Sequence, residues 1–460
     1  MATNPKAYSA PAKGNVVAII AMFFLFAMIS FVTNLAAPLG TIWQNNYDWS
    51  GMLGNMMNFL AYLFMGIPAG SLLTKIGYKK TALYAIIVGL VGLVFQWLSG
   101  IVGTTVEVFP VGEQMVTLNF IIYLLGAFIC GFCVCMLNTV VNPMLNQLGG
   151  GGNRGNQLVQ TGGSLNSLAG TLTPLFVGML IGQVTPATSM GDVAPLLYTA
   201  MGVFVLAFLV ISCVSIPEPH LAKKGEKAVK TKSKYSPWSF RHTTLGVIGI
   251  FFYVGIEVGI PAMLIFYLSD SAASGITENA TAVAGGVVAI YWLLMLVGRL
   301  VSSVISGKVS SRMQMLVVSI TAIVLVCGAI FLPGDIRVSM PSYSAADGFS
   351  MAQVPAKAML LVLCGLCTSV MWGGIFNLAV EGLGKYTAQA SGIFMMMVVG
   401  GGVMPLIQNA IARSAGYMAS YWLIVAMLAY LLYYAFTGCR NVNTDIPVEE
   451  DALASDPRDL

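Results

Sequence analysis

The chain has 460 residues, of which 57% are hydrophobic and only 9% are charged. A water-soluble globular protein would carry far more charge, so this composition indicates a protein that is solvated mainly by lipid. The net charge of +4 is not accompanied by a basic stripe interleaved with exposed aromatic residues, which argues against nucleic acid as a partner.

Apolar runs that are long enough to cross a bilayer recur along the whole chain, because about 20 helical residues cover the hydrocarbon core. We therefore predict an all-α membrane protein with twelve spans. The first run is too long for the apolar core of a signal peptide, and we expect it to remain as a span. The predicted spans are residues 16–44, 51–74, 81–100, 118–147, 157–183, 195–216, 243–269, 282–305, 314–332, 358–383, 388–411 and 417–437.

Basic residues gather on alternate connections between these spans. Lys75, Lys79 and Lys80 follow the second span, and a cluster from Lys223 to Arg241 follows the sixth. The other connections carry mostly acidic residues. Because basic loops stay in the cytoplasm, we predict a multi-pass inner-membrane protein with both termini in the cytoplasm.

The long polar stretch in the middle of the chain divides the spans into two sets of six. Lys75 and Lys79 after the second span correspond to Lys308 and Arg312 after the eighth, at the same offset along the chain, so the halves form a weak internal repeat. We predict an N-terminal half over residues 1–216, a cytoplasmic loop over 217–242, a C-terminal half over 243–437 and an acidic cytoplasmic tail over 438–460.

Six short motifs occur in order over both halves, and together they resemble the fucose–galactose–glucose:proton symporter family of the major facilitator superfamily. This resemblance implies two pseudo-symmetric six-helix halves with a sugar site between them. The motifs are Pro68-Ala-Gly70 with Lys75 and Lys79, Asn138-Thr-Val-Val-Asn142-Pro143, Leu158-Val-Gln160-Thr161, Tyr253-Val-Gly-Ile-Glu257, Gly298-Arg299, and Gly400-Gly-Gly402 with Pro405.

Two positions depart from the family. Its members carry an aspartate on the first helix and a glutamate on the fourth, which serve protonation and sugar binding, and the corresponding residues here are Asn34 and Asn138. An amide can hydrogen bond with sugar hydroxyls but cannot carry a proton. The resemblance therefore implies sugar contacts for both residues, while the two amides leave the family's usual proton site without its carboxyl groups.

Glu257 is the one acidic residue deep within a predicted span. A carboxylate is costly there unless it is solvated, paired or protonated, so its presence suggests a function. We expect Glu257 to bind a coupling cation, either a proton or a sodium ion. A structural hydrogen bond and direct sugar binding are the alternatives.

Amide side chains lie at helical spacing in the fourth and fifth spans. Asn138, Asn142 and Asn146 recur every four positions in the fourth span, and a second helical stripe in the fifth span consists of Gln160, Ser164, Ser167 and Thr171. We expect both faces to turn toward a central cavity, where Asn138, Asn142, Gln160 and also Asn166 would match the hydroxyls of a neutral ligand. The alternative is that they hydrogen bond between helices.

Three further residues are candidates for the walls of this cavity. Trp372 and Tyr253 could cover the apolar face of a sugar ring, and Asn377 follows Trp372 in the same span. Packing against other helices is the alternative. Arg299 and Glu381 both lie near the predicted cytoplasmic ends of their spans, and we expect them to form a gating pair.

Metal and cofactor chemistry is not expected. Most of the eight cysteines lie within apolar spans, and both histidines, His220 and His242, flank the central loop. A membrane enzyme would need a nucleophile–base or metal cluster, and a sensor would need a signalling domain. We find neither.

The sequence therefore predicts a monomeric secondary active transporter in the bilayer. It would import a monosaccharide of hexose, deoxyhexose or amino-sugar type together with a proton or sodium ion. An uncoupled uniporter or an exporter of another small polar solute is the alternative within transport.

Overall fold

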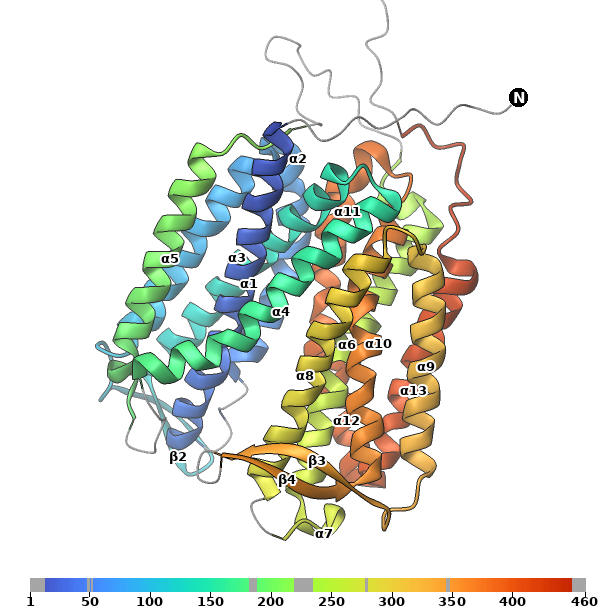
Figure 1. Cartoon of the computed structure of the whole chain (residues 1–460). Coiled ribbons are helices and arrows are strands. Elements are labelled where there is room, and N and C mark those ends of the chain that lie inside the picture. The colour runs from blue at the N-terminus through green and yellow to red at the C-terminus, as the bar shows by residue number, and fades with distance from the viewer. Residues whose placement is uncertain are drawn as a thin grey trace, which may run out of the picture.

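The computed structural model of this chain describes residues 13–47, 50, 53–181, 188–218, 235–277, 280–344 and 348–448. They form a bundle of long helices that run roughly along one direction (Figure 1). The helices are α1 (Lys13–Asn46), α2 (Leu53–Leu98), α3 (Leu118–Leu148), α4 (Gly152–Ile181), α5 (Ala194–Cys213), α6 (Arg241–Ser269), α7 (Ser271–Ser274), α8 (Ala280–Ile305), α9 (Ser311–Phe331), α10 (Ala356–Val380), α11 (Thr387–Met396), α12 (Gly400–Ala415) and α13 (Tyr417–Tyr433).

Twelve crossings follow from these elements. Ten segments of the described chain are long and apolar enough to span a membrane, counting α2 once and joining α11 and α12 through the turn Met397–Val399. The 46 residues of α2 contain two crossings, which meet at Gly77, where φ is 85°. α4, which carries a polar stripe, is the twelfth. The predicted all-α, twelve-span fold is confirmed.

Two β-hairpins, which were not predicted, lie together at one end of the bundle (Figure 1). We call this end the hairpin end. β1 (Glu107–Val111) pairs with β2 (Gln114–Thr117), and β3 (Arg337–Ser344) pairs with β4 (Gly348–Pro355), both antiparallel. They extend two of the connections that the charge pattern placed outside the cytoplasm.

The opposite end carries the basic connections, and we call it the basic end. Lys79 Nζ donates to the carbonyl oxygen of Ser212 at 2.7 Å, at the end of α5. Arg312 donates to the carbonyl oxygens of Ala435 and Phe436, just beyond α13. Each cation thus satisfies the free carbonyl groups at a helix C-terminus. These equivalent contacts support the proposed repeat.

The division of the chain at 217–242 and the cytoplasmic placement of the basic end both stay predictions. Much of the predicted central loop, residues 219–234, and residues 449–460 of the predicted tail lie outside the described residues.

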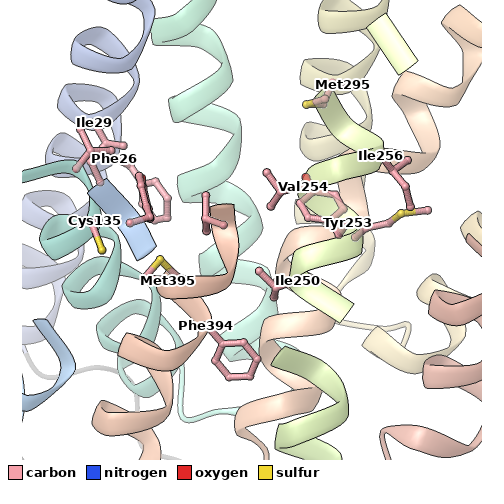
Figure 2. Close-up of a cluster of buried hydrophobic side chains, with 14 of the residues drawn as sticks. Phe26, Ile29, Cys135, Ile250, Tyr253, Val254, Ile256, Met295, Phe394 and Met395 are labelled. Atoms are coloured by element: carbon pink, nitrogen blue, oxygen red, sulfur yellow. The ribbon is translucent and has the colours of Figure 1, made fainter. Parts of the chain in front are cut away.

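The buried core extends across two helix groups, α1–α5 and α6–α13, and reaches the middle of the bundle (Figure 2). Phe26 and Ile29 of α1 lie on one side of this view, and Tyr253 and Val254 of α6 lie on the other. Met395 of α11 approaches the same region from the basic end. Helices from both parts of the chain therefore converge on one central region.

Candidate functional site

A cavity of about 520 Å³ lies in this central region. Its lining comes from α1, α2, α3 and α4 in the first part of the chain and from α6, α8, α10 and the turn Met397–Val399 in the second. This volume falls in the range of small-molecule sites. Of the predicted site residues, the cavity is lined by Asn34, Asn138, Gln160, Asn166, Tyr253, Glu257, Arg299 and Trp372.

A salt bridge lies in the cavity wall. Arg299 Nη2 on α8 is 3.1 Å from Glu257 Oε1 on α6, and the two side chains are only 12% and 17% exposed, respectively. A lone charge at such a site would be costly, and the partner removes much of that cost. The pair therefore brings a titratable carboxyl group into the cavity while keeping the net charge of the pair at zero.

Arg299 also connects the two helix groups. Its Nη1 donates to the carbonyl oxygen of Gly163 at 3.2 Å and to Ser167 Oγ at 2.6 Å, both on α4. One guanidinium group thus joins α8, α6 and α4, because its N–H donors point in several directions at once. A change in the charge of Glu257 would act on a group that holds the halves together.

The predicted pair between Arg299 and Glu381 is wrong for this structure. Glu381 is an exposed residue that follows the last turn of α10 at the basic end. Arg299 lies more than one turn inside α8, and its guanidinium group lies in the cavity wall, where it pairs with Glu257. Position along a span did not reveal this difference in depth.

Two of the cavity amides are anchored near the first helices. Asn34 Nδ2 donates to the carbonyl oxygen of Ser30 at 2.8 Å, and Asn138 Nδ2 donates to the hydroxyl group of Tyr62 at 3.0 Å. These bonds fix the amide planes. Asn138 Oδ1 also accepts from Asn142 Nδ2 at 3.4 Å, and an amide oxygen has two lone pairs, so both residues can still accept from a ligand. Both residues lie where the family resemblance implies sugar contacts.

The two amides of α4 line the cavity and also hold neighbouring helices. Gln160 Nε2 donates to the carbonyl oxygen of Val370 on α10 at 2.9 Å. Asn166 Nδ2 donates to the carbonyl oxygen of Phe26 on α1 at 3.1 Å. These two side chains therefore line the cavity and also hydrogen bond between helices, so both of the alternatives considered for them apply.

Asn142 does not line the cavity but holds a residue that does. It is fully buried, and its Oδ1 accepts from Trp372 Nε1 at 3.0 Å. The ring of Trp372 lies 6.1 Å from that of Tyr253, with 54° between the ring planes. Because its one N–H group is occupied by Asn142, the indole presents carbon surface to the cavity.

The structure does not bring Asn377 to the cavity. Its Oδ1 accepts from Asn146 Nδ2 at 2.7 Å, and its Nδ2 donates to Ser311 Oγ at 2.9 Å. This residue is buried between helices on the basic side of the cavity. The interhelical alternative describes it better than the sugar contact that we predicted.

Further contacts join the helix groups between the cavity and the basic end. Asn156 Nδ2 donates to Ser306 Oγ at 3.0 Å. The backbones of α2 and α11 approach so closely that a Cβ atom added at Gly392 would lie 2.5 Å from the carbonyl oxygen of Gly66 and 2.7 Å from Gly70 Cα. The halves are therefore packed together on the basic side of the cavity.

Sequence reasoning missed some lining residues. Tyr62 supports Asn138, and Phe26 adds aromatic surface. Ser167, which belongs to the predicted polar stripe of the fifth span, lines the cavity and receives a hydrogen bond from Arg299. The missed aromatic residues could not have been found from the sequence, because an aromatic residue in an apolar helix looks the same whether it faces lipid, core or cavity.

Comparisons with known proteins agree with this architecture. Residues 17–404 match the family model of the Major Facilitator Superfamily. The glucose/galactose transporter of Brucella abortus biovar 1 (strain 9-941) is 29% identical over 91% of this chain and 93% of its own length. The L-fucose-proton symporter of Escherichia coli (strain K12) is 21% identical, with 91% of each chain covered.

A solved structure is similar over most of the chain. The crystal structure of the E. coli fucose:proton symporter superposes with a TM-score of 0.72 at 18% identity and covers 92% of this chain and 98% of its own. The predicted resemblance to fucose, galactose and glucose symporters is confirmed by these relatives.

Proposed function

The chain belongs to the Major Facilitator Superfamily, and we propose that it moves a neutral monosaccharide across the membrane by alternating access. The curated relatives are transporters rather than enzymes, and two of them are named for glucose and galactose or for fucose. We therefore propose a hexose or deoxyhexose as the substrate class.

The cavity carries this proposal. Its wall combines the indole ring of Trp372 with the amides of Asn34, Asn138 and Asn166. Aromatic carbon surface suits the C–H face of a sugar ring, and the amides suit its hydroxyl groups. An anionic substrate would need an unpaired cation, but Arg299 is already paired with Glu257.

We propose that the two halves alternate about this cavity. In the present structure they are packed together on the basic side through Asn156, Gln160 and the α2–α11 contact. If the basic end faces the cytoplasm, as the charge pattern predicts, this arrangement closes the cavity to the cytoplasm. Release of the sugar would then require these contacts to separate.

Glu257 is the proposed coupling residue, with the proton as the coupling ion. Asn34 and Asn138 cannot titrate, whereas the Glu257 carboxyl lies in the cavity wall and can. The charge of Arg299 opposes both ions, but a sodium ion would also need room and further oxygen ligands beside this carboxylate, where Arg299 Nη2 already lies 3.1 Å from Oε1, whereas a proton needs neither. A proton can therefore reach this carboxyl group more readily.

Counterflow in proteoliposomes tests the transport function. Vesicles loaded with unlabelled glucose, galactose or fucose should transiently accumulate the labelled sugar, while vesicles loaded with a charged sugar acid should not. Absence of counterflow with every neutral hexose would contradict the proposal. Counterflow without any pH-driven uptake would favour the uncoupled uniporter instead.

Asn138→Ala should weaken sugar binding by ~1–3 kcal/mol, because a sugar hydroxyl then loses its partner in the cavity. Equilibrium binding by calorimetry would measure this loss. Asn119→Ala is the control, since Asn119 lies on the same helix at the hairpin end and outside the cavity lining. Equal affinity in the wild type and Asn138→Ala would assign Asn138 to helix packing.

Asn142→Ala should also weaken sugar binding, chiefly through Trp372, because the bond from Asn142 Nδ2 to Asn138 Oδ1 is longer, at 3.4 Å. Losing the hydrogen bond at 3.0 Å frees the indole to rotate away from its place in the cavity wall. Trp372→Phe lacks the N–H group, so adding Asn142→Ala to that variant should change affinity little. A double-mutant cycle measures this coupling. Additive losses would mean that Asn142 acts elsewhere.

A further inference from the structure

An apolar groove, separate from the transport cavity, lies on the outer surface of the second half at the basic end. Its volume is about 650 Å³, and it runs between α9 and α13. Several of its side chains are more than half exposed, so no other part of the described chain covers it. The groove is lined by Met313, Val317 and Ile320 of α9 and by Ala429, Tyr433 and Phe436 at the end of α13 and in the π-helical turn Tyr434–Gly438.

Two arginine side chains lie at the rim of this groove. Arg312 donates through Nη2 to the carbonyl oxygen of Phe436 at 2.7 Å and through Nε to that of Ala435. Arg241 Nη2 lies 3.4 Å from the hydroxyl group of Tyr433. Each guanidinium group has five N–H donors and is always charged, so both can still bind an anion.

The groove is long enough to cover about two thirds of one membrane leaflet. The seven-residue step from Met313 to Ile320 corresponds to about 10 Å of helix, and half of the hydrocarbon core is about 15 Å thick. Arg312 lies in the first turn of α9, and Arg241, the first residue of α6, lies beside the end of α13, so we expect both at the depth of the lipid headgroups. An occupant that fits must therefore be apolar along the groove and anionic at the basic end.

We propose that this groove binds an anionic phospholipid, with an acyl chain between α9 and α13 and its phosphate at Arg241 and Arg312. Basic pockets between transmembrane helices recognise anionic headgroups through the same combination of charge and apolar contact. The proposal does not depend on sugar transport or on Glu257.

Native mass spectrometry tests it on the full chain, reconstituted in equal parts of phosphatidylglycerol and phosphatidylcholine and released into mild detergent. The wild type should retain phosphatidylglycerol with about a 30-fold preference, the ratio expected for two arginines near an anionic headgroup. Arg241→Gln with Arg312→Gln should bring this preference close to one.

Two further variants separate the groove from general effects of charge and folding. Ala429→Phe fills the groove and leaves both arginines in place, so it should lower the amount of retained phosphatidylglycerol severalfold. Lys75→Gln with Lys80→Gln removes the same charge from the basic end of the first half and should leave the preference unchanged.

Three results would overturn the lipid site. They are equal retention of both lipids by the wild type, the same loss of preference in the lysine control, and full retention by Ala429→Phe. Dimers that Ala429→Phe dissociates would show instead that a second copy of the chain occupies the groove.

Discussion

Glu257→Gln is expected to abolish uphill sugar uptake while preserving exchange of sugar between two filled compartments. Net coupled transport requires the carboxyl group to gain and lose a proton during the cycle, whereas exchange does not. The amide can still accept a hydrogen bond from Arg299, which lies 3.1 Å from Glu257, so the cavity should keep its shape. Uptake driven by a pH gradient and exchange at equal pH, both measured in proteoliposomes, separate the two activities.

Glu381→Gln provides the matched control. It makes the same change from acid to amide at an exposed residue after α10, outside the cavity lining. Uphill uptake by this variant should equal that of the wild type. Concentrative uptake by Glu257→Gln at the wild-type rate would rule out Glu257 as the coupling group, even if sugar counterflow itself remained intact.

Arg299→Ala is expected to destabilise the protein and to open the basic end. It leaves Glu257 as an unpaired charge and removes the bonds to Gly163 and Ser167 that join the halves. Breaking a buried pair in this way costs about 3–5 kcal/mol. Thermal unfolding should report the loss, and distances between spin labels at the basic ends of α3 and α10 should lengthen.

Two comparisons make the result specific to the salt bridge. Arg413→Ala removes an exposed arginine of α12 at the hairpin end, and both readouts should remain at wild-type values. Combining Arg299→Ala with Glu257→Gln should be less harmful than the sum of the single changes, because no unpaired charge remains. Strictly additive effects would mean that Arg299 does not act through Glu257.

The fold could be predicted from the sequence because nearly every span is a continuous apolar run that is long enough to cross a bilayer. The exceptions are informative. The two hairpins lie in polar connections, where the search for bilayer-length runs had nothing to detect. The polar stripe of α4 lowers its hydropathy. Of the predicted amides that line the cavity, α4 supplies two, Gln160 and Asn166, and α1 and α3 supply one each, since a helix that lines a polar cavity cannot be apolar all round.

The candidate site could be predicted only in part, because helical spacing gives the face of a residue but not its depth. Asn138, Asn142 and Asn146 share one face of α3, but they do three different things. Asn138 lines the cavity, Asn142 holds Trp372, and Asn146 bonds to Asn377 where the halves meet. Which partner each amide finds depends on where the opposing helix crosses, and the sequence of α3 alone does not contain that information.

The contact between α2 and α11 offers a way to hold this molecule in its other state. A methyl group at Gly392 would press against the backbone at Gly66 and Gly70, and neither can rotate aside as a flexible side chain could. The smallest possible substitution, Gly392→Ala, would thus act as a steric wedge that works only while the two basic ends are together. This substitution would destabilise only the state in which the basic ends are together, and it would leave the cavity wall unaltered. It would therefore trap the opposite conformation for structure determination without changing a residue that is proposed to bind the sugar.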